Sequence, residues 1–297
     1  MGKIARSWQL AKSSARVLAS TPGLLILPIP GLVGAAGAAA AIYFGIVEPL
    51  GLQSIFSDQA SDQAESEALK IEHGAVLFLF YVCTSFVLTF FNVALAAAAL
   101  KAIRHQPGGV GAGIAAAAGK LWPILGFSAA VAFLGLIRRF LSQRGGVAGG
   151  IASGALGIAA GVATFLVTPV IASEEVGPFA AIRRSAELLR ATWGENIVGS
   201  TGFSLLSVLS VFALVAIGAG GAVAIFAIDP SQTLGVIWLA VIGALLVVLV
   251  VTWSTLGGIY KASLYAYAMD GAVPEGFAPD QIEHAFRKKG AAAAQPA

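Results

Sequence analysis

Long apolar runs separated by short polar segments are the main pattern of this chain. A membrane-spanning helix needs about 20 mostly apolar residues, and six stretches of the sequence provide them. We expect spans at about 24–47, 75–100, 121–137, 147–172, 197–228 and 234–260. The third is short for a full crossing. Pro28 and Pro30 bend the start of the first, Pro169 lies near the end of the fourth, and Met269 is an alternative end for the sixth.

Two polar segments have an amphipathic pattern with helical spacing, at 1–22 and 176–195. The segment Ile4–Lys12 recurs as Ile182–Arg190, with Ile, Arg, Ser and Leu at matching positions. Each copy precedes an apolar run, which predicts an internal repeat of leader, span and span. A weaker third copy, Gly111–Gly119 before the third span, leaves a threefold repeat open.

Both amphipathic segments are expected to lie in the membrane interface. The apolar stripes are Ile4, Trp8, Ala11, Ala15 and Leu18 in the first and Ile182, Ala186, Leu189 and Trp193 in the second. Basic residues beside such stripes favour anionic lipid headgroups. The predicted lipid-anchoring residues are Lys3, Arg6, Trp8, Lys12, Arg16, Arg183, Arg184, Arg190 and Trp193.

Composition supports a membrane protein. The chain is 58% hydrophobic and 11% charged, whereas a soluble domain carries about 25% charged residues. We expect one all-α polytopic membrane domain at 1–282, with an acidic outer loop at 48–73 whose second half extends the second span as a helix. A basic, flexible tail at 283–297 follows. The single cysteine, Cys83, excludes an intrachain disulfide.

Charge placement predicts the orientation. With a cytoplasmic N-terminus, four of the 18 Lys and Arg residues fall outside, namely Lys70, Arg138, Arg139 and Arg144. The other fourteen fall inside, as the positive-inside rule requires. Both termini are then cytoplasmic, the repeats are parallel about an axis normal to the membrane, and a bacterial plasma membrane is the expected location.

The outer arginines Arg138, Arg139 and Arg144 have two interpretations. They extend toward lipid headgroups from a short third span, or they belong to a re-entrant hairpin or an anion-attracting vestibule. Together with Asn92 they form the candidate pore or outer vestibule. No ionisable residue is placed in the middle of a span, and Asn92 is expected to face protein rather than lipid.

Small residues in the fourth span predict close helix packing. Gly150 and Gly154 form one pair, and Ser153, Gly157 and Gly161 form a second ladder, both with a spacing of four. Such spacing allows helix backbones to approach closely. The contacts could lie within one chain or between chains.

The sequence contains no recognised catalytic or metal motif. His73, His105 and His284 are isolated, and no phosphate-binding or nucleophile motif has the required context. The strongest enzyme candidate, Glu174-Glu175, is expected instead to pair with nearby arginines. We therefore expect no enzyme activity, no cofactor or metal and no nucleic-acid partner.

Several segments resemble a known family. They are Arg6–Leu10, Phe90–Leu95, Ala181–Ser185, Leu264–Ala268 and Pro274–Phe277. Together they resemble an uncharacterised family of bacterial six-span membrane proteins, which is distantly similar to the membrane domain of some glycerophosphodiester phosphodiesterases. The resemblance implies a membrane bundle and no known activity.

Two functions remain open from the sequence. The first is a non-catalytic membrane scaffold or assembly subunit that forms a homo-oligomer or binds another membrane protein through its small-residue helix faces. The second is a pore or permease for a lipid-like or uncharged solute. Its basis is the repeat, the proline-broken spans and the outer arginines.

Overall fold

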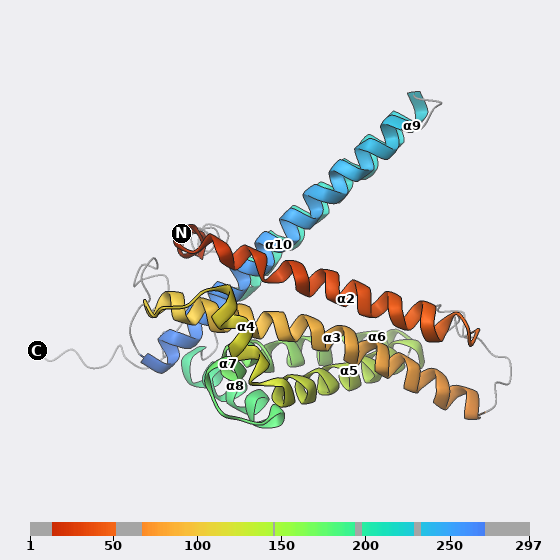
Figure 1. The fold of residues 1–297 in the computed structure, drawn as a ribbon. Coiled ribbons are helices and arrows are strands. Elements are labelled where there is room, and N and C mark those ends of the chain that lie inside the picture. The colour runs from red at the N-terminus through yellow and green to blue at the C-terminus, as the bar shows by residue number, and fades with distance from the viewer. Residues whose placement is uncertain (1–13, 52–66, 145, 194–197, 229–232, 271–297) are drawn as a thin grey trace, which may run out of the picture.

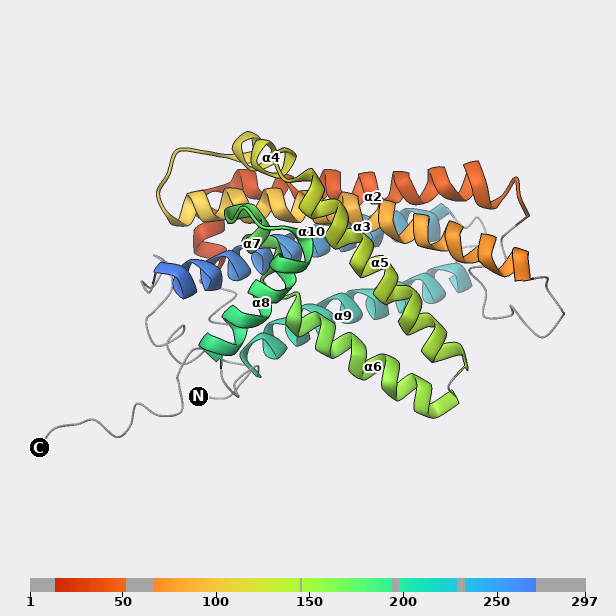
Figure 2. The same cartoon turned by 90° about the horizontal axis from the view of Figure 1, so that it is seen from below.

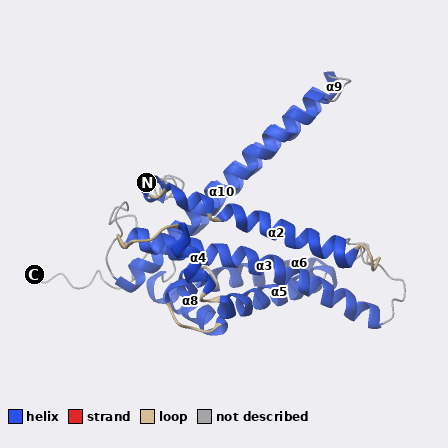
Figure 3. Cartoon of the chain, in the orientation of Figure 1, coloured by secondary structure: helices blue, strands red, loops and turns tan. Residues whose placement is uncertain are grey.

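The computed structural model describes residues 14–51, 67–144, 146–193, 198–228 and 233–270. Every regular element in these ranges is helical, as Figure 3 shows. Six stretches are long and apolar enough to cross a membrane, at Pro22–Val47, Gly74–Ile103, Leu121–Ser142, Gly146–Ser173, Leu205–Ala227 and Thr233–Asp270. The predicted all-α polytopic membrane bundle is confirmed, and the chain is a multi-pass membrane protein.

In the first span, proline starts a helix and glycines let that helix pack closely on its neighbour. The 3₁₀ helix η1 (Pro22–Ile26) precedes α2 (Pro28–Ile42), and the π-helix η2 (Tyr43–Val47) continues the span. Pro28 suits the first turn of α2, because a helix leaves its first N–H groups without internal partners. Gly31 and Gly34 let α2 lie against Phe91 and Val87 of α3 (Glu67–Ile103).

The central helix α3 contacts most other elements. It packs on α2, on α4 (Val110–Ala118), on α5 (Leu121–Arg144) and on α10 (Thr233–Asp270). Its start at Glu67 confirms a helical extension of the second span there, and the rest of the predicted extension lies outside the described residues. The helix α10 runs past residue 260 to Asp270, so the longer predicted end of the sixth span is confirmed.

The third span is longer than its apolar run suggested. Helix α5 has 24 residues and includes Arg138 and Arg139, so the prediction of a short span was wrong. Arginine is a good helix former, and its long stem allows the charged end to reach polar surroundings. The helix therefore continues beyond the point where the purely apolar pattern stops.

The fourth span contains a break. Helix α6 (Gly146–Ala163) is followed by a turn at 164–166 and by α7 (Val167–Ser173). Pro169 lacks the N–H that would bond to the carbonyl of Phe165, so the helix cannot pass this point unchanged. The buried hydroxyl of Ser185 in α8 (Pro178–Trp193) accepts a hydrogen bond from the N–H of Leu166, at 3.0 Å.

Three pairs of helices extend in one direction from a common end. Figures 1 and 2 show the pairs α2–α3, α5–α6 and α9–α10, with α9 at Val198–Ile228, running to the right. In Figure 1 the pair α9–α10 rises away from the other two. We call the common end, where α4, α7, α8 and the last turns of α3 and α10 meet, the basal end.

The buried core lies at the basal end. Its largest fully buried side chains include Leu24, Leu95, Ile124, Ile171 and Tyr265, which come from η1, α3, α5, α7 and α10. In contrast, α9 packs mainly on α10, and it exposes Val208, Phe212 and Val223. The core therefore joins the helix pairs at one end.

The described helices follow a threefold order. A helix at 14–20, α4 and α8 each precede two spans in the chain. This is the order of the predicted leader, span and span unit. An internal repeat remains a prediction.

A substitution at Gly113 tests the close packing of α4 on α3. A Cβ atom at Gly113 would overlap the backbone carbonyl oxygen of Ala94, whereas one at Gly111 in the same helix would meet nothing within 4 Å. Overpacking of this kind costs about 1–3 kcal/mol. We expect Gly113→Ala to lower the midpoint of thermal unfolding in detergent micelles and Gly111→Ala to leave it unchanged. Equal midpoints for the two variants would contradict this packing.

Candidate functional site

The polar side chains of the basal half form two groups. One is a charged cluster of Lys120, Glu174, Glu175, Arg184 and Tyr265, which we call the basal cluster. The other lines a pocket between α3, α7, α9 and α10, which we call the junction pocket. The cluster connects elements of the core, whereas the pocket lies where the pair α9–α10 joins the rest of the protein.

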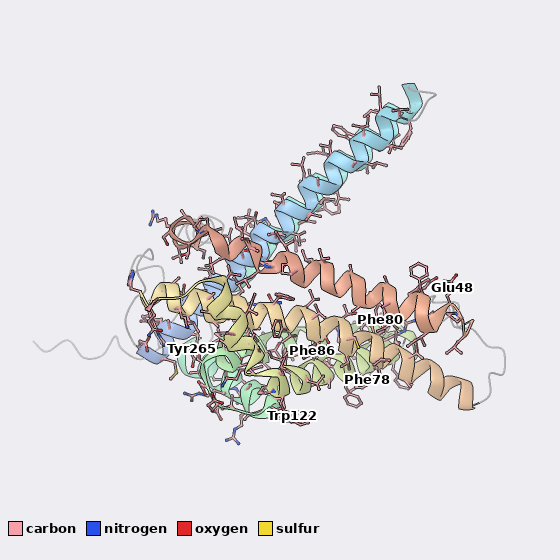
Figure 4. The ribbon with its side chains drawn as sticks, viewed as in Figure 1. Glu48, Phe78, Phe80, Phe86, Trp122 and Tyr265 are labelled. Carbon is pink, nitrogen blue, oxygen red and sulfur yellow. The ribbon has the colours of Figure 1, made fainter. Side chains whose placement is uncertain are left out.

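Glu174, directly after α7, is the centre of the basal cluster. Its Oε1 accepts a hydrogen bond from the hydroxyl of Tyr265 at 2.9 Å and one from Nε of Arg184 at 3.3 Å. Figure 4 shows Tyr265 among the packed helices of the basal end. One carboxylate thus links the end of α7 to both α8 and α10.

Lys120 joins α5 to the same cluster. Its Nζ donates a hydrogen bond to the backbone carbonyl of Glu174 at 3.0 Å and forms an ion pair with Glu175. The Lys120 side chain is 12% exposed, whereas that of Glu175 is 93% exposed. The carbonyl bond is therefore the better shielded of the two contacts. Nearby, Arg104 at the end of α3 pairs with Asp270 at the end of α10, at 3.1 Å.

The two glutamates act as structural ion-pair partners here. Pairing with an arginine was expected, and Arg184 provides it for Glu174, but the partner of Glu175 is Lys120. The described residues contain no group of three or more His, Cys, Asp or Glu side chains that could hold a metal ion. The cluster can hold helices together, and its carboxylates are already engaged by cations.

Helix α8 has a different buried face from the one expected. Ala181, Ser185 and Leu188 are buried outside the predicted stripe; within that stripe Leu189 is buried, whereas Ile182 and Ala186 are only half-buried. The prediction of a stripe placed in lipid was wrong in this respect. The face with Ser185 turns inward, because Ser185 bonds to the break between α6 and α7, and α8 packs on α5, α6 and α7.

The predicted anchoring residues that the structure describes lie at the basal end. Arg183 is exposed and pairs with Glu187, Arg190 is exposed, and Arg184 belongs to the basal cluster. Arg16 lies in the helix at 14–20, and Trp193 ends α8. Lys3, Arg6, Trp8 and Lys12 lie outside the described residues.

Trp122 and Phe179 were not predicted as anchors. Their side chains are 74% and 75% exposed at the basal end, and Figure 4 shows Trp122 pointing away from the bundle. Exposed aromatic rings are typical of membrane interfaces. The sequence could have indicated these two anchors, because each aromatic residue lies in the first turn of its helix.

The predicted packing residues of α6 divide between two faces. Ser153 and Gly157 face α5, where Nε of Arg138 donates a hydrogen bond to the carbonyl of Ser153 at 3.2 Å and the guanidinium lies over Gly157. Gly150, Gly154 and Gly161 have open space around them. The prediction placed Gly161 with Ser153 and Gly157, but the structure places it on the open face.

The four candidate pore residues are not brought together. Arg138, Arg139 and Arg144 lie on the last two turns of α5, at the end away from the basal core. Asn92 lies on α3 and lines the junction pocket in the basal half. It is exposed at the rim of this pocket, and its expected orientation toward protein rather than lipid stays a prediction.

The junction pocket is a cavity of about 410 Å³ with a mixed lining. It is lined by Asn92, Phe165, Thr168, Ser207, Val208, Trp253, Ser254, Gly257, Gly258, Tyr260 and Lys261. Asn92 and Val208 are exposed at its rim. Polar groups thus gather in a hollow between otherwise apolar helices.

Lys261 is the charged residue of the pocket. It lies nine residues before the end of α10, and its Nζ stands 5.3 Å from the centre of the Phe165 ring. The sequence placed Lys261 on the inner side, directly after an apolar run that ends at residue 260, with a helical continuation to Met269 as the alternative. The structure has the continuous helix.

The basal cluster predicts that substitutions of Glu174 and of Glu187 differ in how much stability they remove. Glu174→Gln removes the charge that holds Arg184, from a side chain that is 21% exposed, and we expect a loss of about 1–3 kcal/mol of stability. Glu187→Gln breaks only the exposed pair with Arg183 on α8, worth less than about 0.5 kcal/mol. Thermal unfolding in micelles measures both, and equal effects would contradict a central role for Glu174.

Comparisons with known proteins place the chain in a family. No curated protein and no solved structure matches the chain. A family described as "Family of unknown function (DUF6159)" matches residues 71–276, which is more than half of the chain and includes the junction pocket and the basal cluster. The chain belongs to this family of unknown function.

Proposed function

We propose that this protein is a non-catalytic membrane scaffold or assembly subunit that binds a second copy of itself through α6. The observation that carries the proposal is the outward face of α6. Val147, Ile151 and Ile158 are 84%, 69% and 73% exposed there, and Gly150, Gly154 and Gly161 lie between them. With the helical repeat of 3.6 residues, these six residues form one continuous stripe.

The stripe combines the two features of close helix dimers. Glycines four residues apart let a second backbone approach, and neighbouring branched side chains pack beside the crossing point. The opposite face of α6 is already used, because Gly149 meets the backbone of Leu141 and Gly157 meets Arg138. The glycines of the open face therefore have no packing role within the described chain.

The basal cluster also favours a non-catalytic role. Its carboxylates hold α5, α7, α8 and α10 together through cations and a tyrosine hydroxyl. A general base needs access to a substrate proton, and Glu174 is instead engaged by two donors. Complementation by a Glu174→Gln/Glu175→Gln double variant tests this part of the proposal, and loss of function from a folded variant would contradict it.

We also propose the orientation and the location. The basal end faces the cytoplasm of a bacterial cell, because Arg16, Lys101, Lys120 and the arginines of α8 gather there. Three arginines near the end of α5 lie at the opposite end. The three leader, span and span units are then parallel repeats, and a distant similarity to the membrane domain of some glycerophosphodiester phosphodiesterases belongs to the same proposal.

A second candidate, a permease for a lipid-like or uncharged solute, is favoured by the junction pocket. The pocket offers polar groups beside lipid-exposed helices. Flux of labelled lipids across liposomes that contain the protein tests this candidate. Faster flux that an Asn92→Leu variant abolishes and an Arg138→Ala/Arg139→Ala variant retains would favour it over the scaffold.

Assembly through α6 predicts a specific loss on substitution. We expect Gly154→Leu to remove most of the oligomer, because the larger side chain keeps the second helix at a distance. Chemical cross-linking in membranes and native mass spectrometry from lipid nanodiscs measure the oligomer.

The matched control is Gly243→Leu on α10, an exposed glycine that also has open space around it. This variant is expected to assemble like the unmodified protein. A strict monomer with no partner, or equal assembly of both variants, would overturn the proposal.

A further inference from the structure

The junction pocket contains hydroxyl groups that donate no hydrogen bond within the part of the chain that the structure describes. In the helices around it, Thr164, Ser210, Thr252, Thr255 and Ser263 donate to backbone carbonyls three or four residues earlier. This local bond is the usual solution for a hydroxyl in a membrane helix. Within the described chain, Thr168, Ser207 and Ser254 donate no such bond.

The pocket also contains a cation without a carboxylate partner in the described part of the chain. The ion pairs found there join Arg104, Lys120, Arg183 and Arg184 to acidic residues. Lys261 instead stands over the Phe165 ring. A positive charge in low-dielectric surroundings is costly without an opposite charge, so the pocket is suited to an anion.

The depth of the pocket along the helices indicates which class of anion could reach it. Lys261 lies about 14 Å along the helix axis from the end of α10, at 1.5 Å per residue. The uncharged stretch of α10 from Leu234 to Tyr260 has 27 residues, which is enough to cross the hydrocarbon region, and Lys261 follows it directly at its basal end. The pocket is therefore level with the start of the hydrocarbon region on the basal side, where phospholipids carry their phosphates.

The apolar surface beside the pocket suits acyl chains. Val208 lines the pocket, and it is 62% exposed. Leu205, Leu209 and Phe212 on the same helix are 51%, 55% and 70% exposed. An anion in the pocket thus lies next to a lipid-facing surface that extends toward the middle of the membrane.

We propose that the junction pocket binds one phospholipid of the basal leaflet by its phosphate. Lys261 supplies the charge, and the amide of Asn92 with the hydroxyls of Thr168, Ser207 and Ser254 supplies hydrogen-bond donors. The acyl chains lie along α9. The bound lipid fills the junction between α9–α10 and α3, and the site is independent of assembly through α6.

Native mass spectrometry of the purified full-length protein with added phosphatidylglycerol tests the proposal. We expect Lys261→Met to reduce lipid binding roughly fivefold, which corresponds to about 1 kcal/mol for one lysine near a lipid phosphate. Lys261→Arg is expected to retain binding. The control is Lys101→Met, a basal lysine outside the pocket, which is expected to bind like the unmodified protein.

A second variant keeps the test valid if removal of the charge impairs folding. Val208→Trp narrows the rim of the pocket without changing its charge, and it is also expected to reduce lipid binding. Folding of every variant is checked by its thermal midpoint and its elution in size exclusion.

The source of the phosphate is tested separately. Inorganic phosphate without lipid is expected not to raise the thermal midpoint at millimolar concentration, because it lacks acyl chains. Stabilisation by inorganic phosphate alone, or equal lipid binding by the unmodified protein, Lys261→Met and Val208→Trp, would overturn the proposal.

Discussion

Burial of apolar side chains at the basal end is the interaction on which the rest of this structure depends. Within a bilayer, lipid tails are as apolar as leucine, so the hydrophobic effect does not drive helices together there. Close van der Waals packing brings them together instead. The buried residues of η1, α3, α5, α7, α8 and α10 gather at the basal end, and the helix pairs extend from it.

The break in the fourth span depends on this core, because residues of the core provide partners for the polar groups at the break. Pro169 ends the regular hydrogen bonding of α6, and a free N–H in lipid is costly. Ser185 accepts the bond of Leu166, and Glu174 then fixes the end of α7 to Tyr265 and Arg184. The amphipathic helix α8 is thus a structural part of the core.

Beyond the core, the protein leaves surfaces for its surroundings. The open glycine face of α6 suits a second helix, and the junction pocket suits the phosphate of a lipid. Both proposals have the same physical basis, which is a group that has no partner among the described residues. One is a helix backbone that can be approached closely, and the other is the positive charge of Lys261, which has no carboxylate partner in those residues.

The sequence alone determined the membrane class, the six spans and the amphipathic helix α8, because these depend on local hydropathy and helical periodicity. It also indicated that Glu174 forms an ion pair with an arginine, since Arg184 is close in the chain. Tertiary structure decided the rest. The inward face of α8, the division of the α6 glycines and the contacts of Lys120 and Tyr265 with Glu174 depend on helices far apart in sequence. Lys261 shows the reason most clearly, because the sequence allows a helix that continues past it, whereas only the packing of α10 against α3 and α7 places it beside a pocket.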